Sequence, residues 1–217
     1  MLESRNAFIN IAAHFQPAMS LIKLPRAEAS LGHPLELLLA RRRSVRDFAP
    51  GALSLVQASC LLWAAQGISD ARGLRTAPSA GALYPLGLYL VAGDIAGIEP
   101  AIYRYLPREN AVERIQPGDR RAALAAAAMN QSWLADAALT LAFSACYART
   151  TKKYDKRGIQ YVHMEAGHAA QNALLTAVAL NLGAAVVGAF DDRRVAAVLG
   201  LPREETPLYL VPVGRSA

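Results

Sequence analysis

The chain has 217 residues, of which 53% are hydrophobic and 18% charged, so it can bury a substantial core but is short for two domains. Its 23 lysines and arginines against 17 aspartates and glutamates give a net charge of +6, which nucleic-acid-binding proteins share with many enzymes of anionic substrates. The N-terminus lacks the pattern of a signal peptide, and no apolar run reaches the ~18 residues of a membrane span. Composition therefore predicts one domain in a cytoplasmic protein. It leaves open whether the excess positive charge serves nucleic acid or another anionic ligand.

The N-terminal part is predicted to form an arm over residues 1–33, with a short helix over 5–15 and a stretch broken by prolines and a glycine. A helix is expected to begin near Pro34, because proline suits the first turn, and to run through Arg43. The arginine-rich sequence RRRSVRDF, residues 41–48, covers the end of this helix and the loop after it.

A second helix is indicated by Ser54 and Gln57, which have the capping-box spacing, and it is expected to end at Gly67, where a left-handed cap is favourable. Residues 75–85, RTAPSAGALYP, form a loop of small residues, built for close backbone approach rather than for exposing Ser79 as a nucleophile. The expected strands after this loop are 86–94, 101–106 and 111–115, the last two forming a hairpin.

The C-terminal half mixes helices with separate strands, which favours a single α+β domain. The longest helix is predicted over 157–182, because Gly183 stops it and no proline interrupts it; its small residues would let another helix approach closely, at a central or subunit-interface position. The other expected elements are an alanine-rich helix capped by Asp119, a buried strand over 137–147, a strand over 184–190, a helix capped by Asp191 or Asp192 and a final strand over 207–214.

Several familiar sites are missing from the sequence. Neither the glycine-rich fingerprint of a dinucleotide fold nor a P-loop is present, so both folds lack their phosphate cradle. Cys60 and Cys146 stand far apart in apolar sequence, which predicts buried thiols rather than a zinc or redox site. His163 and His168 are five residues apart and point roughly 140° apart on a helix, unlike an i, i+4 metal-binding pair. No metal site is predicted.

The arginines of residues 41–48 allow more than one interpretation. Positive charge at a helix C-terminus offsets the helix dipole, which accounts for Arg41 and for Arg43. Ser44 and Arg46 come after the turn and would converge with Arg42 only around an anion. A phosphate site and a solvated basic patch both remain open on these grounds. Nucleic acid is not the expected partner, because the cluster lacks interleaved aromatic residues.

The motifs in order are ARRRSVRDF, LLWAAQGI, RTAPSAGALYPLGLYLV, KYDKRGIQYVHMEAGHAAQNALLTAVALNLG, GAF and PLYLVPVG. In this order the chain resembles the FMN-dependent nitroreductase superfamily, and most closely its SagB-type dehydrogenases, also called thiazole or azoline oxidases. The resemblance covers nearly everything from about residue 33 onward, so an FMN-binding domain is expected over 34–217. It implies a nitroreductase-like fold: a mixed, mainly antiparallel sheet flanked by helices, with the long central helix at a dimer interface.

The resemblance further implies a homodimer with two FMN sites between the subunits. Arg42 and Ser44 would bind the FMN phosphate and ribityl end, with Arg43 counted among the cofactor-binding residues. Arg46 would lie against the pyrimidine edge of the flavin, where a cation stabilises the reduced, anionic form. The remaining expected cofactor contacts are Pro78, Ser79, Ala80 and Gly81 from the other subunit, Gly188 and Ala189 at a strand end, and Arg215 near the C-terminus.

In azoline oxidases a Lys-Tyr pair beside the flavin is implicated in removing the substrate proton, and Lys153-Tyr154 stands at the matching place. A lysine acts as a base only when desolvated, so a solvent-facing lysine beside an interface tyrosine stays an open alternative. The expected activity is hydride transfer through flavin N5, with a heterocycle, a modified peptide or another small organic molecule as substrate. The alternatives are an NADH- or NADPH-dependent reductase of nitroaromatics or quinones and, as a non-enzyme, a basic protein that binds phosphate or nucleic acid.

Overall fold

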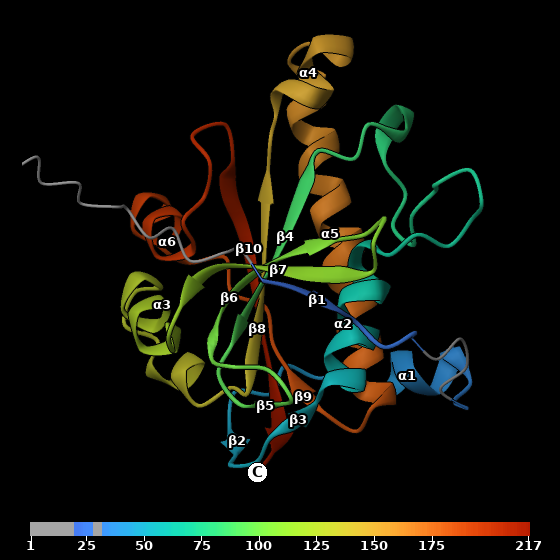
Figure 1. Cartoon of the computed structure of the whole chain (residues 1–217). Coiled ribbons are helices and arrows are strands. Elements are labelled where there is room, and N and C mark those ends of the chain that lie inside the picture. The colour runs from blue at the N-terminus through green and yellow to red at the C-terminus, as the bar shows by residue number, and fades with distance from the viewer. Residues whose placement is uncertain (1–19, 28–31) are drawn as a thin grey trace, which may run out of the picture.

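The computed structural model describes residues 20–27 and 32–217 and shows a central sheet between two layers of helices (Figure 1). In the described part of the chain the sheet runs β1-β7-β6-β4-β8-β10-β2, with β9 also paired to β10, and its pairings are antiparallel. Its strands are β1 Leu21–Lys23, β2 Phe48–Ala49, β4 Leu86–Ala92, β6 Ala101–Leu106, β7 Ala111–Pro117, β8 Leu139–Ala145, β9 Gly183–Ala184 and β10 Thr206–Ser216. Two short strands, β3 (Leu53–Ser54) and β5 (Ile95–Ala96), pair in parallel, so the predicted mixed, mainly antiparallel α+β fold is confirmed.

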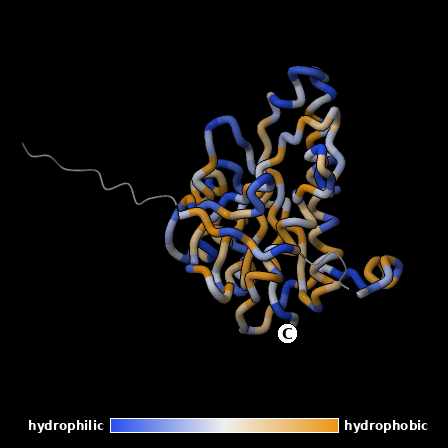
Figure 2. Tube along the Cα trace, turned by 45° about the vertical axis from the view of Figure 1, so that its right-hand side comes forward, coloured by the Kyte–Doolittle hydropathy of each residue, from blue (hydrophilic) through white to orange (hydrophobic). Residues whose placement is uncertain are grey.

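The helices divide between the two faces of the sheet. On one face lie α2 (Leu55–Gln66) and the long α5 (Arg157–Ala179); on the other lie α3 (Arg121–Ala127) and α6 (Asp192–Leu199). Strand β4 feeds both cores, because successive side chains of a strand point to opposite faces. Leu88 and Leu90 accordingly pack in the larger core with α2 and α5, and Tyr89 and Val91 in the smaller core with α3 and α6. Figure 2 shows the hydrophobic stretches gathered along these inner elements.

The N-terminal arm is partly incorporated into the sheet. Strand β1 pairs with β7, and Leu24 directly after it is buried, so the boundary predicted at residue 34 leaves out a strand of the domain. The helix predicted over 5–15 lies outside the described residues. Helix α1 spans Leu35–Arg41, which is two residues shorter than expected, and none of its residues is buried.

Two predicted helix N-termini are confirmed. The capping box of Ser54 and Gln57 opens α2, and Asp191 caps α6 by accepting the Arg194 backbone N–H. Asp119 accepts the backbone N–H of Arg121, but the N-cap of α3 is Arg120 and no side chain caps this helix, so the predicted Asp119 cap is wrong. The left-handed cap expected at the end of α2 is wrong, because Gly67 is extended at φ −67°. Glycine is required there because a Cβ would overlap the Trp63 ring.

The longest helix and the strand after it depart from their predicted ends. Helix α5 stops at Ala179 rather than at residue 182, and the chain turns through a left-handed Asn181. The strand predicted over 184–190 is wrong beyond Ala184. Beyond it, the Ala185 N–H donates to the Pro212 carbonyl of β10 at 3.3 Å, and Val187 exchanges hydrogen bonds with Leu210 as an isolated bridge, so Gly188 and Ala189 do not end a strand as predicted.

The small residues of α5 mainly serve the chain's own core. Ala169, Ala173 and Ala177 are fully buried in the larger core, whereas Gly167 is exposed. Of the two cysteines, Cys60 is buried as predicted, but Cys146 is only half-buried. Within the described residues no helix combines the length and apolar character needed to cross a bilayer.

Candidate functional site

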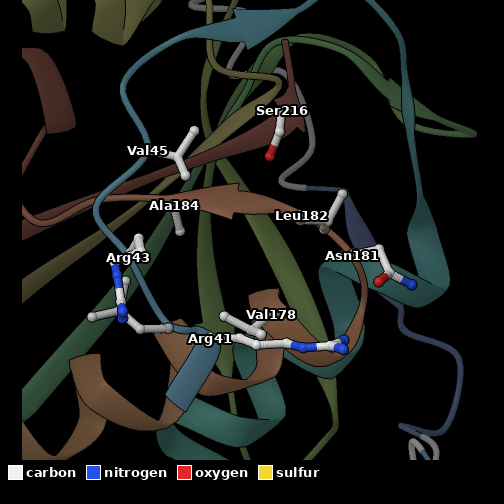
Figure 3. A pocket seen from close by; sticks show the side chains of 9 residues that line it. Arg41, Arg43, Val45, Val178, Asn181, Leu182, Ala184 and Ser216 are labelled. Atoms are coloured by element: carbon white, nitrogen blue, oxygen red, sulfur yellow. The ribbon is translucent and has the colours of Figure 1, made fainter. Parts of the chain in front are cut away.

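The arginine-rich segment between α1 and β2 contributes alternate residues to one pocket. Arg43 and Val45 line a pocket of about 280 Å³ together with Arg41, whereas Arg42, Ser44 and Arg46 do not line it. Figure 3 shows this pocket, with Asn181 near the C-terminal end of α5 and Ser216 of β10 on its walls. The cluster therefore separates by alternate residues, which sequence spacing alone had not shown.

Arg43 is tied to the end of α1. Its guanidinium donates to the carbonyl oxygens of Ala40, at 3.1 Å, and of Arg42, at 2.7 Å. These are carbonyl groups left free by the last turn of the helix, so Arg43 acts as the helix-end cation that the sequence allowed.

Arg46 lies on the aromatic ring of Trp133. Its guanidinium carbon is 5.7 Å from the ring centroid, within cation–π range, and Phe48 packs beside the same ring at 6.2 Å. One residue before the short helix that carries Trp133 (Ser132–Ala135), the Gln131 side-chain amide donates to the Ala189 carbonyl at 3.1 Å. One short segment therefore supports both Arg46 and Ala189, two residues predicted to contact the flavin.

Sequence reasoning missed Gln131 and Trp133. Their signal was a glutamine and an aromatic residue placed just before the buried strand β8, within an otherwise small and polar stretch. The contact between the exposed Arg46 and Trp133 forms only when the fold brings β2 and this segment together, so sequence spacing does not reveal it.

Arg215 is placed near the end of β10, where the strand pairs with β2. Its guanidinium donates to the Ala52 carbonyl at 3.2 Å, and its side chain packs so closely on Gly51 that a Cβ there would lie 2.8 Å from Nε. Its neighbour Ser216 faces the Arg43 pocket, and successive strand residues point to opposite sides, so Arg215 is directed away from that pocket.

The positive charges of Arg42 and Arg46 are not neutralised within the described part of the chain. The ion pairs found there engage Arg72, Arg104, Arg114 and Arg121. A guanidinium without a carboxylate partner keeps its donors available for an oxyanion such as phosphate. Arg42, Ser44 and Arg46 thus fit the phosphate-bearing group that the sequence predicts.

The loop of small residues meets the predicted catalytic pair. Gly81 is left-handed, at φ +63°, and a Cβ on it would lie 2.8 Å from the Tyr154 hydroxyl and 3.0 Å from Lys153 Nζ. Lys153 and Tyr154 end helix α4 (Ala148–Tyr154), and Asp155 at φ 47° turns the chain into α5. Lys153 is exposed, with Nζ 5.3 Å from the Tyr154 ring centroid. Two motifs some seventy residues apart in sequence thus form one site.

A shallow apolar groove of about 290 Å³ lies between this loop and α5. Its walls are Pro78, Ser79, Ala80, Tyr161, Met164, Glu165 and His168. The Glu165 carboxyl is only 3% exposed, and its Oε1 has no hydrogen-bond partner among the described residues. Burial raises the pKa of Glu165 to about 7, although the Ser79 hydroxyl and the Arg75 guanidinium act to lower it.

A larger pocket, of about 500 Å³, opens beside Gly188 on the other side of α5. On its wall the Tyr147 hydroxyl and His163 Nε2 are 2.7 Å apart, and burial, followed by the charge of Asp192, raises the pKa of Tyr147. His163 faces this pocket and His168 the groove, so the two histidines are separated as their five-residue spacing predicted.

The model of the nitroreductase family matches residues 39–215. A Methanocaldococcus jannaschii protein provisionally named a nitroreductase is 45% identical to this chain over 181 residues. The match covers 83% of this chain and 90% of the Methanocaldococcus protein. The crystal structure of a provisional nitroreductase from Ralstonia eutropha JMP134 has a TM-score of 0.80 at 32% identity, covering 91% of this chain and 90% of the other.

A third likeness concerns the fold alone. The E. coli microcin synthetase McbBCD complex, with truncated pro-MccB17 bound, matches with a TM-score of 0.74 at 24% identity, over 97% of this chain and 80% of the other. The family match covers most of the domain and includes the arginine segment, the small-residue loop and Lys153-Tyr154. The chain therefore belongs to the nitroreductase family and is an FMN-dependent oxidoreductase.

Proposed function

We propose that the protein is a SagB-type dehydrogenase that oxidises a heterocyclic or other small organic substrate. The observation that carries this proposal is the contact of Lys153 and Tyr154 with Gly81, because it joins the proton-accepting pair to the loop expected at the flavin. The likeness in fold to a microcin synthetase complex is the reason to include modified peptides among the substrates. The cytoplasmic location stays a prediction.

FMN would be held by Arg42, Ser44 and Arg46, with Arg215 as a further candidate. The first three do not line the Arg43 pocket, and neither Arg42 nor Arg46 has a carboxylate partner in the described residues, which suits a phosphate ligand. When bound, FMN supplies the two-electron chemistry of the reaction. Arg43, which the sequence placed in this set, is left out because it binds the end of α1.

The small residues predicted at the flavin leave room for a flat ligand. Pro78, Gly81, Gly188 and Ala189 are exposed, and none carries a side chain that projects far. Beyond Gly188 the pocket of about 500 Å³ offers space for a substrate. Its wall carries Tyr147 and His163, which can hold or accept a proton from a bound molecule.

The enzyme would act as a homodimer with FMN between the subunits. Exposed apolar side chains on two helices support this: Leu35 and Leu39 on α1 are 57% and 53% exposed, and Ile159 and Met164 on α5 are 42% and 50% exposed. A partner that covers α5 would also meet the groove beside Ser79, which agrees with a loop shared between subunits.

The second candidate function is a reductase of nitroaromatics or quinones that uses NADH or NADPH. It is favoured by the 45% identity with a protein provisionally named a nitroreductase. The exposure of Lys153 also fits this candidate, because a lysine acts as a base only when it is desolvated. The non-enzyme alternative is set aside by the family assignment.

Flavin reduction separates the two candidates. The FMN-loaded protein, kept under anaerobic conditions, is mixed with NADH, NADPH or dithionite while the visible flavin absorbance is followed. Bleaching by dithionite and by neither nicotinamide supports the dehydrogenase. Rapid bleaching by NADH or NADPH, followed by recovery on adding a nitroaromatic or a quinone, would establish the reductase instead.

The proposed base is tested by Lys153→Met and Tyr154→Phe. In a dehydrogenase, either change should lower kcat about 10²- to 10⁴-fold, the range typical for loss of a general base, while FMN affinity stays the same. Lys152→Met is the matched control, since Lys152 is an equally exposed neighbour on α4. A Lys153→Met enzyme with the activity of the control would remove Lys153 from the mechanism.

A further inference from the structure

The guanidinium of Arg46 has one partner among the described residues, the indole ring of Trp133. The guanidinium carbon lies 5.7 Å from the ring centroid, and within that part of the chain Arg46 makes no hydrogen bond or ion pair. Arg46 is exposed, and an exposed arginine without a contact takes up many rotamers in water. The ring of Trp133 therefore determines where this positive charge lies.

Arg104 shows a different arrangement. Its guanidinium also lies near an aromatic ring, 5.9 Å from the Tyr89 centroid, but it pairs with Glu205 at 3.1 Å. A carboxylate of the protein thus engages one of its donors. The contact between Arg46 and Trp133 uses no oxygen acceptor, so the N–H donors of Arg46 stay available for an acceptor atom on a ligand.

Trp133 is itself held in place. It lies in the short helix Ser132–Ala135, is half-buried and packs against the smaller core, and the next residue, Leu134, is fully buried there. Phe48, which is buried in β2, packs beside its ring with the centroids 6.2 Å apart. This packing restricts the rotamers of Trp133, so its ring gives Arg46 a fixed surface.

We propose that Trp133 is a positioning residue that holds the guanidinium of Arg46 at the pyrimidine edge of FMN and thereby favours the reduced, anionic flavin. The inference rests on the proposed function for one step, namely that Arg46 contacts the flavin. A cation that is already in place loses little conformational freedom on binding, so more of its attraction is left to stabilise the anion. Trp133 acts through Arg46 and transfers neither hydride nor proton.

The midpoint potential of bound FMN is the quantity that this role should change. Compared with free FMN, it reports how much more tightly the protein binds the reduced form than the oxidised form. Trp133→Leu keeps an apolar side chain against the smaller core but removes the cation–π contact. It should lower the preference for reduced FMN about threefold to tenfold, a fall of about 15–30 mV for a two-electron couple.

The test is a double-mutant cycle at Trp133 and Arg46, measured under anaerobic conditions on the FMN-loaded full chain. Arg46→Ala should lower the potential at least as far as Trp133→Leu does. In the Arg46→Ala background, Trp133→Leu should then add no further change. A fall of equal size in both backgrounds would show that the ring acts without Arg46 and would overturn the proposal, as would a Trp133→Leu protein with the wild-type potential.

Further variants separate the contact from a loss of packing. Trp133→Phe keeps a weaker aromatic face, so its potential should lie between those of the wild type and Trp133→Leu. Should Trp133→Leu fail to fold, Trp133→Met takes its place with the same expected fall. Trp63→Phe is the control, because Trp63 lies on α2 and its indole N–H donates to the Ile68 carbonyl. It should leave the preference for reduced FMN within about twofold of the wild type.

Arg46→Ala also separates this inference from the proposed function. FMN affinity and potential that are both unchanged in Arg46→Ala would refute the contact between Arg46 and the flavin, and the inference with it. A lower potential in Arg46→Ala beside an unchanged potential in Trp133→Leu would keep that contact and refute the role of Trp133 alone.

Discussion

Glu165 and Glu205 are two buried carboxylates with opposite surroundings. Glu205, 8% exposed, is fully bonded: its Oε2 accepts the hydroxyls of Tyr89 at 2.9 Å and Ser144 at 2.5 Å, and its Oε1 pairs with Arg104 at 3.1 Å. Glu165 is more deeply buried, yet one of its oxygens has no partner in the described residues and no cation is bonded to it.

The difference between these two carboxylates separates a structural role from a functional one. A satisfied network on the face of a sheet fixes the packing of β4, β8 and β10 and has nothing left to offer a ligand. An unsatisfied carboxyl costs stability, and such groups concentrate at functional sites. Glu165 lies beside the loop that the family resemblance assigns to the flavin, whereas Glu205 bonds to Tyr89, which packs in the smaller core.

Removal of Glu205 should have the largest effect on folding. Glu205→Ala leaves two buried hydroxyls and Arg104 unpaired, which should lower the free energy of unfolding by about 3–5 kcal/mol. Urea unfolding measures this change. The neighbouring Glu204 is exposed, so Glu204→Ala should change stability by no more than about 0.5 kcal/mol. Equal effects of the two changes would show that the network does not hold the sheet.

Replacement of Glu165 should have the opposite sign and depend on pH. The folded-state pKa of about 7 lies above the ordinary value of 4.5, so the folded state binds the extra proton and wild-type stability falls as pH rises through this window. Glu165→Gln removes that loss and should be more stable than the wild type by up to about 3 kcal/mol at about pH 8, with no gain near pH 4.5. Unfolding curves across this range measure the gain. A pH-independent difference would argue against a titrating Glu165.

A smaller effect is expected where the loop meets the catalytic pair. Gly81→Ala combines a left-handed backbone with crowding by Tyr154 and Lys153, and should cost about 1–2 kcal/mol. Gly97→Ala is the control, because Gly97 is also left-handed, at φ +91°, but a Cβ there meets nothing within 4 Å. Thermal unfolding of both variants isolates the contribution of the contact, which is absent if the two lose the same stability.

Features set by neighbouring residues could be predicted from the sequence. The capping box at Ser54, the aspartate cap of α6 and the hairpin of β6 and β7 depend on groups a few positions apart, and all three are confirmed. Features set by distant partners could not. The strand expected over 184–190 failed because beyond Ala184 it meets β10 through an Ala185–Pro212 hydrogen bond and the isolated Val187–Leu210 bridge rather than a continuous ladder. Trp133 was missed because its contact, Arg46, lies 87 positions away.

The candidate site likewise has parts that could be predicted from the sequence and parts that depend on distant partners. The motifs identified the arginine segment, the small-residue loop and Lys153-Tyr154. Their spacing could not show that Arg43 lines a pocket that Arg42 does not line, or that Gly81 meets Tyr154. Glu165 was not among the site residues predicted from the sequence. Its burial and its free oxygen arise from the packing of α5 against the loop, which a one-dimensional pattern does not contain.

The alternation of the arginine segment is tested most directly by FMN binding to two charge-matched double variants. Arg42→Ala with Arg46→Ala should weaken FMN binding by about 100-fold or more, because two charge-assisted contacts are lost. Arg41→Ala with Arg43→Ala removes the same charge from the two arginines that line the pocket of Figure 3, and should stay within about threefold of the wild type. Equal losses in the two pairs, or a larger loss in the second, would contradict the proposed site.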